Sequence, residues 1–353
     1  MMSRRRALVG LGLVPLFACR AARARSDARK VSLAVGGKAA LFYLPLTLAE
    51  RLGYFAAEGL QVKILDFAGG AKALQAMMGG SADFVSGGID HVLTLRARGQ
   101  KLQSFVLQTA TTSIALGVAR GRTFRSAADL AGMKVGVTAP GSSTHMVVNH
   151  LLTAAGLRAD DVSIIGVGTG PAAVAAMKAG HIDALANVEP AITILKRSGA
   201  MNVVVETMSE RGCRQVFGEL LPVGSLYTRE AFIRQNPAIV QGLTNAMVKA
   251  LLWLQKATPQ QVLQAVPAQY AMGDPAVYLA AYQRSRPGYS RDGSIPAAGV
   301  AALYEALRRF DPAVRAAPEF DVGQAFDNRF VQQALKGTGQ ASSDGASRVI
   351  AIS

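Results

Sequence analysis

One stretch of the chain recurs one hundred residues further on, and this internal repeat limits the possible folds more than any other feature of the sequence. The two copies carry the same residue types at the same relative places: Gly70, Ala73, Ala76, Met77, Gly80 and Asp83 are matched by Gly170, Ala173, Ala176, Met177, Gly180 and Asp183. Each copy predicts a glycine turn, a helix of about three turns, and a Gly-x-x-Asp sequence that leads into a short apolar strand. A repeat of so long a period indicates two similar lobes and not a solenoid.

Strands and helices alternate around both copies of the repeat. Further strands are expected at residues 102–108, 114–119, 203–205 and 224–227, and those around the repeat cover residues 30–35, 61–67, 84–86, 134–137 and 162–167. Helices of roughly 10–15 residues separate them, a pattern typical of a mostly parallel sheet covered by helices. Each lobe should therefore be a doubly wound α/β unit, and a chain of 353 residues is long enough for each lobe to bury its own core.

The same pattern predicts the boundaries of the lobes. We expect lobe 1 to comprise residues 30–120 and 224–335, and lobe 2 to comprise residues 125–220. The chain would then cross between the lobes twice, near residues 119–125 and 221–224, and the two crossings would form a hinge. The last residues, 337–353, are rich in Gly and Ser, which predicts a flexible tail.

The first 24 residues have the features of an export signal. Three arginines at positions 4–6 precede an uncharged run up to Cys19, and Ala22-Arg23-Ala24 offers a small-x-small cleavage site. The uncharged run is too short to span a bilayer. We therefore expect a periplasmic protein. Two processing routes stay open, ordinary cleavage or lipid attachment at Cys19 after a lipoprotein-like Leu16–Cys19 segment, and Ser3-Arg4-Arg5 also resembles a twin-arginine signal.

Charge and cysteine content narrow the function classes. The net charge is +15, and five of the positive charges lie in the first 24 residues. The remaining basic residues are dispersed and no aromatic-rich basic stripe accompanies them, which argues against nucleic acid as a partner and favours small anions or an acidic membrane surface. Beyond Cys19 only Cys213 remains, so we expect neither a disulfide in the mature chain, nor a Cys/His metal site, nor any cofactor.

A ligand of such a protein should bind where the strands end. In parallel doubly wound sheets, ligands lie beyond the carboxyl ends of the strands, where helices begin. The candidate ligand-binding residues are those in the corresponding loops of both lobes: Lys38, Phe42, Tyr43, Gly69, Gly70, Ser86, Gly87, Gly141, Ser142, Ser143, Thr144, Thr169, Asn187 and Glu189.

The loop at residues 140–144 is the most specific of these. Gly141 lets the backbone approach a ligand, and the hydroxyls and free N–H groups at a helix start favour an anion. The alternative is that Ser142 or Ser143 only caps the helix. Alternatives also stay open for other candidates: Lys38 could be solvated, Glu189 could form a structural salt bridge instead of accepting hydrogen bonds from a ligand, and Phe42 and Tyr43 could belong to the core.

Motifs for catalysis are absent from the sequence. The four histidines, His91, His145, His150 and His181, have no carboxylate or cysteine partner at a diagnostic spacing. No Gly-x-Ser-x-Gly elbow, phosphate loop or zinc-binding helix is present. We therefore expect a binding protein and not an enzyme, although catalytic triads need not be local in sequence.

Several segments in order resemble the solute-binding proteins of nitrate, sulfonate and taurine importers. They are the run from Leu44 to Phe55, Glu58-Gly59-Leu60, Gly69-Gly70 through Asp83-Phe84, the run from Asp129 to Gly136, Gly180 to Ala184, Glu189-Pro190 and Asn236-Pro237. The resemblance covers roughly residues 30–260. It extends to proteins that bind the pyrimidine precursor of thiamine.

The resemblance implies a periplasmic binding protein of type II that closes around a small solute and delivers it to an ABC permease, its transient partner. The implied solutes are small anionic or zwitterionic organic molecules of the sulfonate, taurine and nitrate class. Two alternatives remain: a binder of a thiamine-type pyrimidine or another amino-heterocycle, for which Glu189 is the argument, and an exported enzyme or sensor on the same fold.

Overall fold

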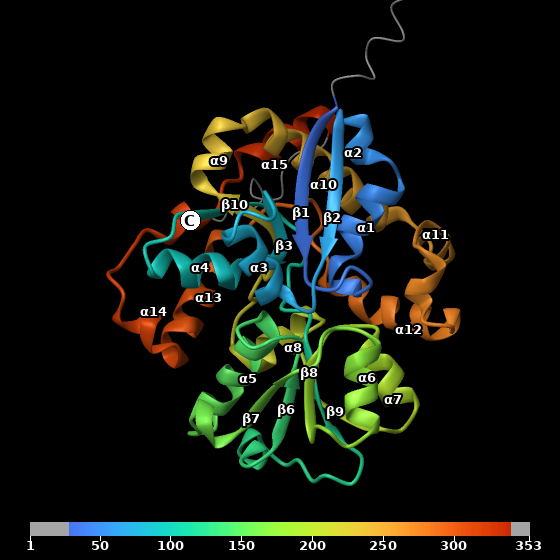
Figure 1. Ribbon diagram of the computed structural model, residues 1–353, viewed down its shortest axis with the longest axis vertical. Coiled ribbons are helices and arrows are strands. Elements are labelled where there is room, and N and C mark those ends of the chain that lie inside the picture. The colour runs from blue at the N-terminus through green and yellow to red at the C-terminus, as the bar shows by residue number, and fades with distance from the viewer. Residues whose placement is uncertain (1–27, 340–353) are drawn as a thin grey trace, which may run out of the picture.

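The computed structural model describes residues 28–339, which form two α/β lobes, one above the other in Figure 1. The first lobe has a five-stranded sheet of order β2-β1-β3-β10-β4, made of β1 (Arg29–Val35), β2 (Leu60–Asp66), β3 (Phe84–Gly88), β4 (Leu102–Leu107) and β10 (Gly224–Arg229). The second has the order β7-β6-β8-β5-β9, made of β5 (Ala115–Ala119), β6 (Lys134–Val137), β7 (Ser163–Gly166), β8 (Ala184–Asn187) and β9 (Met201–Glu206).

The two sheets have the same topology. In each, three neighbouring strands run parallel, and the fourth, β10 or β5, is antiparallel to both strands beside it. The predicted fold class, two similar doubly wound α/β lobes, is confirmed.

The first crossing between the lobes does not lie where the sequence pattern placed it. Strand β5 pairs with β8 and β9, so the chain leaves lobe 1 between β4 and β5, at residues 108–114, and not near residues 119–125. The prediction was wrong because an apolar strand fits either sheet, and only its pairing decides to which it belongs. The chain returns between β9 and β10, at residues 207–223, a stretch that contains α8 (Glu210–Phe217).

The internal repeat has the same structural role in both lobes. It forms the helices α3 (Gly70–Met78) and α6 (Pro171–Lys178), and the repeated Ala and Met residues at the third and seventh positions after the repeated glycine are buried: Ala73, Met77, Ala173 and Met177. After each helix the chain turns at a glycine of positive φ, +82° at Gly80 and +71° at Gly180.

The other helices cover both sheets and the outside of lobe 1. Those of the first half are α1 (Leu44–Arg51), α2 (Tyr54–Ala57), α4 (Ile89–Ala97), α5 (Ser143–Ala154) and α7 (Ala191–Arg197). The last part of the chain forms α9 (Glu230–Gln235), α10 (Pro237–Lys256), α11 (Pro259–Ala265), α12 (Pro275–Ser285), α13 (Ala297–Phe310), α14 (Pro312–Ala316) and α15 (Arg329–Thr338). Short 3-10 turns lie at Leu41–Tyr43, Ala127–Leu130, Ala159–Asp161, Ala268–Ala271, Arg286–Gly288 and Val322–Ala325.

Two of the C-terminal helices contact both lobes. Helix α12 packs against α7 of lobe 2 and against the turn Leu41–Tyr43 of lobe 1, and α13 packs against α4 of lobe 1 and α5 of lobe 2. Both lie at the level of the junction in Figure 1. The assignment of residues 224–335 to lobe 1 alone therefore needs correction, because amphipathic periodicity shows that a helix has an apolar face but not which lobe covers it.

The predictions for the two ends fall mostly outside the described residues. The export signal at residues 1–24, with Cys19, lies outside them, as do residues 340–353 of the predicted tail. The tail begins later than predicted, because α15 runs to Thr338 and buries Leu335. Within residues 28–339 no helix has the length and hydropathy needed to cross a membrane.

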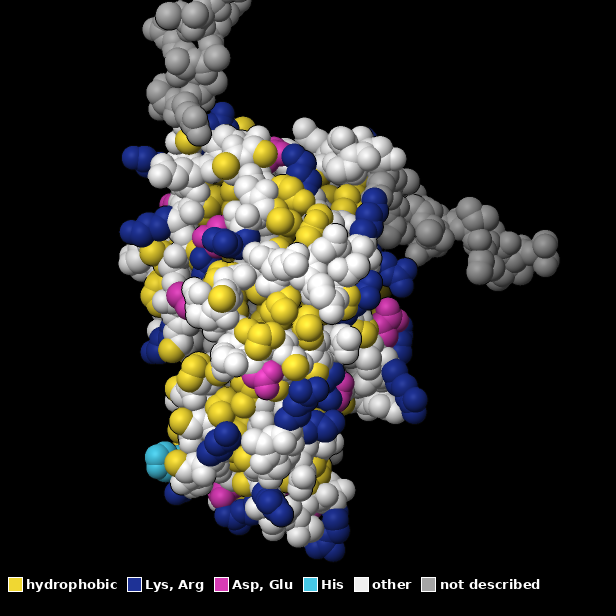
Figure 2. Space-filling model, turned by 90° about the vertical axis from the view of Figure 1, so that its right-hand side faces the viewer, with side chains coloured by type: hydrophobic (Ala, Val, Ile, Leu, Met, Phe, Trp, Pro, Cys, Tyr) yellow, Lys and Arg dark blue, Asp and Glu magenta, His cyan; other side chains and the backbone are white. Residues whose placement is uncertain are grey.

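The charged side chains are spread over the face of the molecule shown in Figure 2. On the face shown in Figure 2, Lys and Arg side chains form separate small groups, with hydrophobic and uncharged side chains between them. Acidic side chains lie next to several of these groups. The positive charge of the chain is thus distributed over this face and does not form a single continuous band.

Candidate functional site

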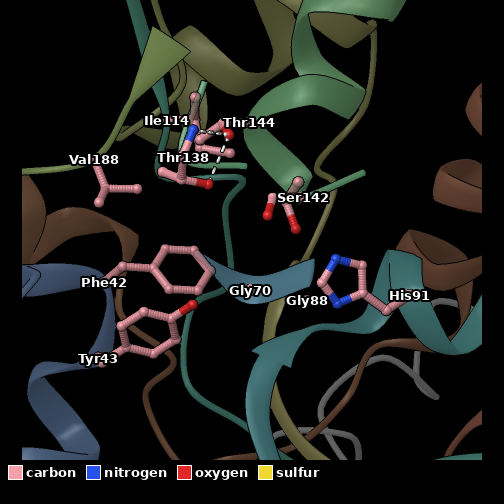
Figure 3. A pocket seen from close by; sticks show the side chains of 11 residues that line it. Phe42, Tyr43, Gly70, Gly88, His91, Ile114, Thr138, Ser142, Thr144 and Val188 are labelled. Carbon is pink, nitrogen blue, oxygen red and sulfur yellow. Dashed lines mark hydrogen bonds between the residues drawn. The ribbon is translucent and has the colours of Figure 1, made fainter. Parts of the chain in front are cut away.

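A small cavity lies between the lobes, where helices of both begin. Lobe 1 contributes the start of α3 and the turn before α1, and lobe 2 contributes the start of α5 and the end of β6. The lining residues are Phe42, Tyr43, Gly70, Gly88, His91, Ile114, Thr138, Ser142, Ser143, Thr144 and Val188 (Figure 3). The space between their atoms is about 330 Å³. This figure includes space that is open to solvent, and the room enclosed between the lobes in this closed arrangement is about that of one water molecule.

The hydroxyl of Ser142 connects the two lobes. Ser142 is the residue before the first turn of α5, but its side chain makes no hydrogen bond to that turn. Its Oγ instead accepts a hydrogen bond of 2.9 Å from the N–H of Ala71, in the first turn of α3. Ser142 therefore does not cap α5, which was the alternative to a binding role. Its hydroxyl satisfies one free N–H of a helix in the opposite lobe.

The next two hydroxyls of this loop have different partners. Ser143 Oγ donates a hydrogen bond of 2.8 Å across the cleft to Oδ1 of Asp90 in α4. Thr144 Oγ1 stays within lobe 2, where it accepts from the N–H of Thr138 at 3.0 Å and lies 2.9 Å from the Thr138 hydroxyl. Two of the three hydroxyls thus bind groups of lobe 1, and both lobes are held together around the cavity.

Phe42 and Tyr43 form an aromatic wall on the lobe 1 side. Their ring centroids are 4.9 Å apart at an interplanar angle of 80°, an edge-to-face pair, and both rings are buried. Burial, and then the negative charges of Asp90 and Asp66, raise the pKa of the Tyr43 hydroxyl well above its usual range. That hydroxyl therefore stays protonated at neutral pH.

His91 faces the cavity from the first turn of α4 (Figure 3). Its Nδ1 lies 3.0 Å from the hydroxyl of Tyr227, while its Nε2 is buried without a hydrogen-bond partner and lies 4.0 Å from Oδ2 of Asp90. His91 was not among the binding residues predicted from the sequence, nor were the lining residues Gly88, Ile114, Thr138 and Val188. Gly88 directly follows the candidates at the end of β3 and His91 comes three residues later, so a wider window after this strand would have included both.

Five of the sequence candidates lie at or near the cavity without lining it. Gly69 approaches the backbone of lobe 2, since an added Cβ would lie 3.0 Å from the carbonyl oxygen of Thr138. Thr169 lies at the edge of the cleft, where a Cβ on Gly37 would meet its Oγ1 at 1.9 Å. Gly141 has a φ of +84°, and its N–H donates to Nδ1 of His145.

Ser86 and Gly87, the other two of the five, are packed within lobe 1. Ser86 Oγ accepts from the side chain of Gln108 at 2.9 Å, and an added Cβ on Gly87 would lie 3.2 Å from the hydroxyl of Tyr227. The sheet of lobe 1 therefore uses both positions for its own packing.

Three further candidates have structural partners and do not line the cavity. Lys38 forms an ion pair of 2.7 Å with Glu50. Asn187 donates to the carbonyl of Gly168 at 2.9 Å and accepts from the N–H of Val188. The contacts with Glu50 and Gly168 were not foreseeable from spacing, because these partners lie 12 and 19 residues away.

The third is Glu189, whose side chain is 0% exposed. It accepts hydrogen bonds of 2.9 Å from the N–H and the hydroxyl of Thr193 and from Nε of Arg284. Burial raises the pKa of this carboxyl above its usual value, and the contacts with Thr193 and Arg284 offset part of that effect. The structural salt bridge, one of the two alternatives for Glu189, is thus the arrangement observed.

A known protein family matches the part of the chain that forms the cavity. The sequence model of the NMT1/THI5-like family matches residues 42–261, more than half of the chain. The chain belongs to this family. The match begins at Phe42, in the aromatic wall, and ends in α11, so it includes the described lining residues of the cavity.

Two solved structures are similar to this chain over most of its length. A protein of Bordetella bronchiseptica RB50 is 46% identical, with a TM-score of 0.85 over 89% of this chain and 99% of its own. The alkanesulfonate-binding protein SsuA of Xanthomonas axonopodis pv. citri, solved with MOPS bound, is 20% identical, with a TM-score of 0.66 over 86% of this chain and 99% of its own. The likeness to SsuA shows the fold.

An enzyme is also among the relatives. The 4-amino-5-hydroxymethyl-2-methylpyrimidine phosphate synthase of Aspergillus parasiticus is 26% identical over 277 residues, which are 74% of this chain and 77% of the synthase. The resemblance to solute-binding proteins and to proteins of thiamine-precursor chemistry is therefore confirmed. Within residues 28–339 no group of three His, Cys, Asp or Glu side chains is placed to hold a metal ion.

Proposed function

We propose that this member of the NMT1/THI5-like family is the substrate-binding component of an ABC importer, which captures a small solute by closure of its two lobes and delivers it to a permease. The observation that supports the proposal best is the cavity between the lobes, to which both contribute a helix start. Hydrogen bonds from Ala71 to Ser142 and from Ser143 to Asp90 join the lobes around it. A ligand in this place would contact both lobes and stabilise the closed state.

The solute that we propose is a small anionic or zwitterionic organic molecule, of the sulfonate, taurine and nitrate class. Helix starts present free N–H groups and the positive end of the helix dipole, which favour a negative group. The start of α5 has no side-chain cap, and the N–H of Ala71 at the start of α3 is held by the Ser142 hydroxyl, which a solute would replace. A sulfonate, MOPS, occupies the related SsuA.

A second candidate is an amino-heterocycle such as a thiamine-type pyrimidine. The edge-to-face pair of Phe42 and Tyr43 offers a flat apolar surface to a ring, and one relative is a pyrimidine phosphate synthase. Glu189, the earlier argument for this class, interacts with Arg284 and Thr193. The case for an amino-heterocycle therefore depends on the aromatic pair of Phe42 and Tyr43.

We infer that the cavity binds its solute without transforming it. In the described part of the chain, the Ser142 and Ser143 hydroxyls pair with Ala71 N–H and with Asp90. Neither is hydrogen bonded to a histidine, the arrangement that activates a serine nucleophile. Mass spectrometry of a solute recovered after prolonged incubation should find it unchanged, and a new product would contradict this inference.

The place of action that we propose is the periplasm, reached with the export signal at residues 1–24. Mass spectrometry of the exported protein distinguishes the two processing routes. An N-terminus at Arg25 indicates ordinary cleavage, and a lipid-modified Cys19 indicates a lipoprotein. An exported chain that retains Met1 would contradict both.

A thermal-shift screen of the mature chain tests the proposed function. The panel contains alkanesulfonates, taurine, nitrate and aminopyrimidines, and calorimetry follows every hit. A charge-assisted hydrogen bond contributes about 1.5–3 kcal/mol, so Ser142→Ala and Ser143→Ala should each weaken binding roughly tenfold to a hundredfold.

Ser198→Ala is the matched control for these variants. The Ser198 hydroxyl donates to the carbonyl of Leu195 at the end of α7, in an exposed position away from the cavity. Its removal should leave affinity unchanged. Equal affinities of wild type and both cavity variants would show that the solute binds elsewhere.

A further inference from the structure

A buried carboxylate lies beside the cavity. Asp90 lies in the first turn of α4, is 3% exposed, and accepts the hydrogen bond of Ser143 from the start of α5. No Lys or Arg is among the described residues that line the cavity. The start of α5, where a free anion would be expected to bind, thus faces the negative charge of the protein itself.

His91 beside Asp90 has an unsatisfied ring nitrogen. The residue is 5% exposed, its Nδ1 pairs with Tyr227, and its Nε2 has no partner although Oδ2 of Asp90 is 4.0 Å away. Unpaired buried polar atoms are rare in folded proteins and often mark the place of a ligand. Asp90 and His91 also line a groove that adjoins the cavity between α3, α4, α5 and α13, in which the half-exposed Arg98 pairs with Asp311. A solute group at this junction could therefore reach both side chains.

The packing around Asp90 keeps the carboxylate at this place. A Cβ added to Gly88 would lie 1.9 Å from Oδ1 of Asp90 and 2.3 Å from Oγ of Ser143, so only glycine leaves room for the two side chains to meet. In the described structure the ion pairs of Asp90 include no Lys or Arg. A buried carboxylate without a Lys or Arg partner repels an anion and attracts an ammonium or N–H group.

We propose that Asp90 determines the specificity of the cleft, and that it selects solutes with a protonated amine or an N–H-donating amino group over solutes that are only anionic. This inference rests on the proposed solute-binding function. On binding, the amino group of the solute replaces Ser143 as the partner of Asp90. The Ser143 hydroxyl then becomes free to donate to an acidic group of the same solute, so a zwitterion satisfies both sides of the cleft.

Matched pairs of solutes test the proposal by calorimetry on the full mature chain. Taurine is compared with isethionate, which has a hydroxyl in place of the ammonium group, and 4-aminopyrimidine is compared with pyrimidine. Wild type should bind the amino member of at least one pair about tenfold or more tightly than its partner, as expected for a charge-assisted hydrogen bond. Asp90→Asn keeps an acceptor for Ser143 but removes the charge, so it should abolish this preference.

Two further variants separate the role of Asp90 from its place in the fold. Ser143→Ala retains the carboxylate, so the preference for the amino member should persist. Glu210→Gln neutralises an exposed carboxylate in the first turn of α8 and should leave every affinity unchanged. Circular dichroism confirms that each variant is folded, and Ser143→Ala remains informative should Asp90→Asn not fold.

The outcomes distinguish this inference from the proposed function. Equal binding of both members of each pair, tighter binding of isethionate or pyrimidine, a preference retained in Asp90→Asn, or one lost in Ser143→Ala overturns the role of Asp90 while solute binding stands. If none of the four compounds binds to wild type, the proposed solute class fails and the inference fails with it.

Discussion

Arg284 reaches from α12 to two acidic side chains of lobe 2. Its Nε donates to Glu189 at 2.9 Å and its terminal nitrogen donates to Glu206 at 3.0 Å. Glu189 is fully buried, while Arg284 is 23% exposed and Glu206 is more exposed still. At the residue scale, the buried carboxylate of Glu189 is therefore the group whose charge Arg284 compensates.

Removing Arg284 should destabilise the protein strongly at neutral pH. A buried charge that loses its partner costs about 3–5 kcal/mol, and we expect about 3 kcal/mol for Arg284→Ala because the arginine is partly solvated. In the background Glu189→Gln, which has no charge to compensate, the same change should cost only about 1 kcal/mol. Urea denaturation of wild type, both single variants and the double variant measures both values. Equal losses in both backgrounds would show that Arg284 does not compensate the charge of Glu189.

The loss of unfolding free energy in Arg284→Ala should also depend on pH. Burial raises the pKa of Glu189 above its ordinary value of 4.5, so this carboxyl favours the folded state most below that value and loses this contribution as the pH rises. Without Arg284 the raised pKa rises further. The difference in unfolding free energy between wild type and variant should therefore be smaller at pH 4 than at pH 7, as denaturation at both values would show.

At the scale of elements, the repeated aspartate joins corresponding strands in both lobes. Asp83, before β3, accepts hydrogen bonds of 2.7 Å from the N–H and the hydroxyl of Ser32 in β1. Asp183, before β8, accepts from the N–H of Lys134 in β6 at 2.9 Å and pairs with Arg122. The Gly-x-x-Asp sequence therefore fixes the strand after the repeat helix to its parallel neighbour.

Asp83→Ala and Asp183→Ala should destabilise the chain by similar amounts. Each leaves a strand N–H without its acceptor, and we expect a cost of about 1 kcal/mol, the low end for such a loss, because the contact of Asp83 is only partly buried and that of Asp183 is exposed. Asp160→Ala is the control, because Asp160 pairs with Arg158 on the exposed surface, where ion pairs contribute little. Thermal denaturation compares the three, and a loss for Asp160→Ala as large as for the other two would refute the explanation.

The contribution of Asp183 to the stability of the fold should depend on pH. The backbone hydrogen bond from Lys134, with the charge of Arg122, lowers the pKa of Asp183 below its ordinary value of 3.8. Its stabilising contribution is therefore complete above that value and is lost as the pH falls below it. The difference between wild type and Asp183→Ala should shrink in strongly acidic buffer.

The whole molecule is held in a closed arrangement by contacts between the lobes. The Ala71–Ser142 and Ser143–Asp90 hydrogen bonds are joined by one from the N–H of Leu41 to the carbonyl of Glu189, at 2.9 Å. At the edge of the cleft, Gly37 lies so close to Thr169 that an added Cβ would overlap its hydroxyl. Closure therefore requires a glycine at position 37.

Solution scattering should detect this closure as a decrease in the radius of gyration when the solute binds. Gly37→Ala should reduce the decrease, because its methyl group collides with lobe 2. Gly53→Ala is a matched control, since Gly53 also has a positive φ, +73° against +105°, but has no atom within 4 Å of the added Cβ. A radius of gyration unchanged by saturating solute would count against hinge closure.

The sequence alone determined the elements, the repeat and the type of fold, because these depend on interactions within a few residues. Periodic apolar positions form helix faces, and glycines at 80 and 180 allow the left-handed turns that end them. The same local chemistry indicated residues 141–144 as a helix start, and three hydroxyls of this loop do line the cavity.

The tertiary structure alone decided which groups meet across long distances in the chain. Strand β5 joined lobe 2 through its pairing with β8 and β9, and Glu189 found Arg284, 95 residues away, in a place where a ligand had been expected. Asp90 and Ser143, 53 residues apart, meet only because two helix starts converge across the cleft. Such partners depend on packing of whole elements, and sequence spacing carries no information about it.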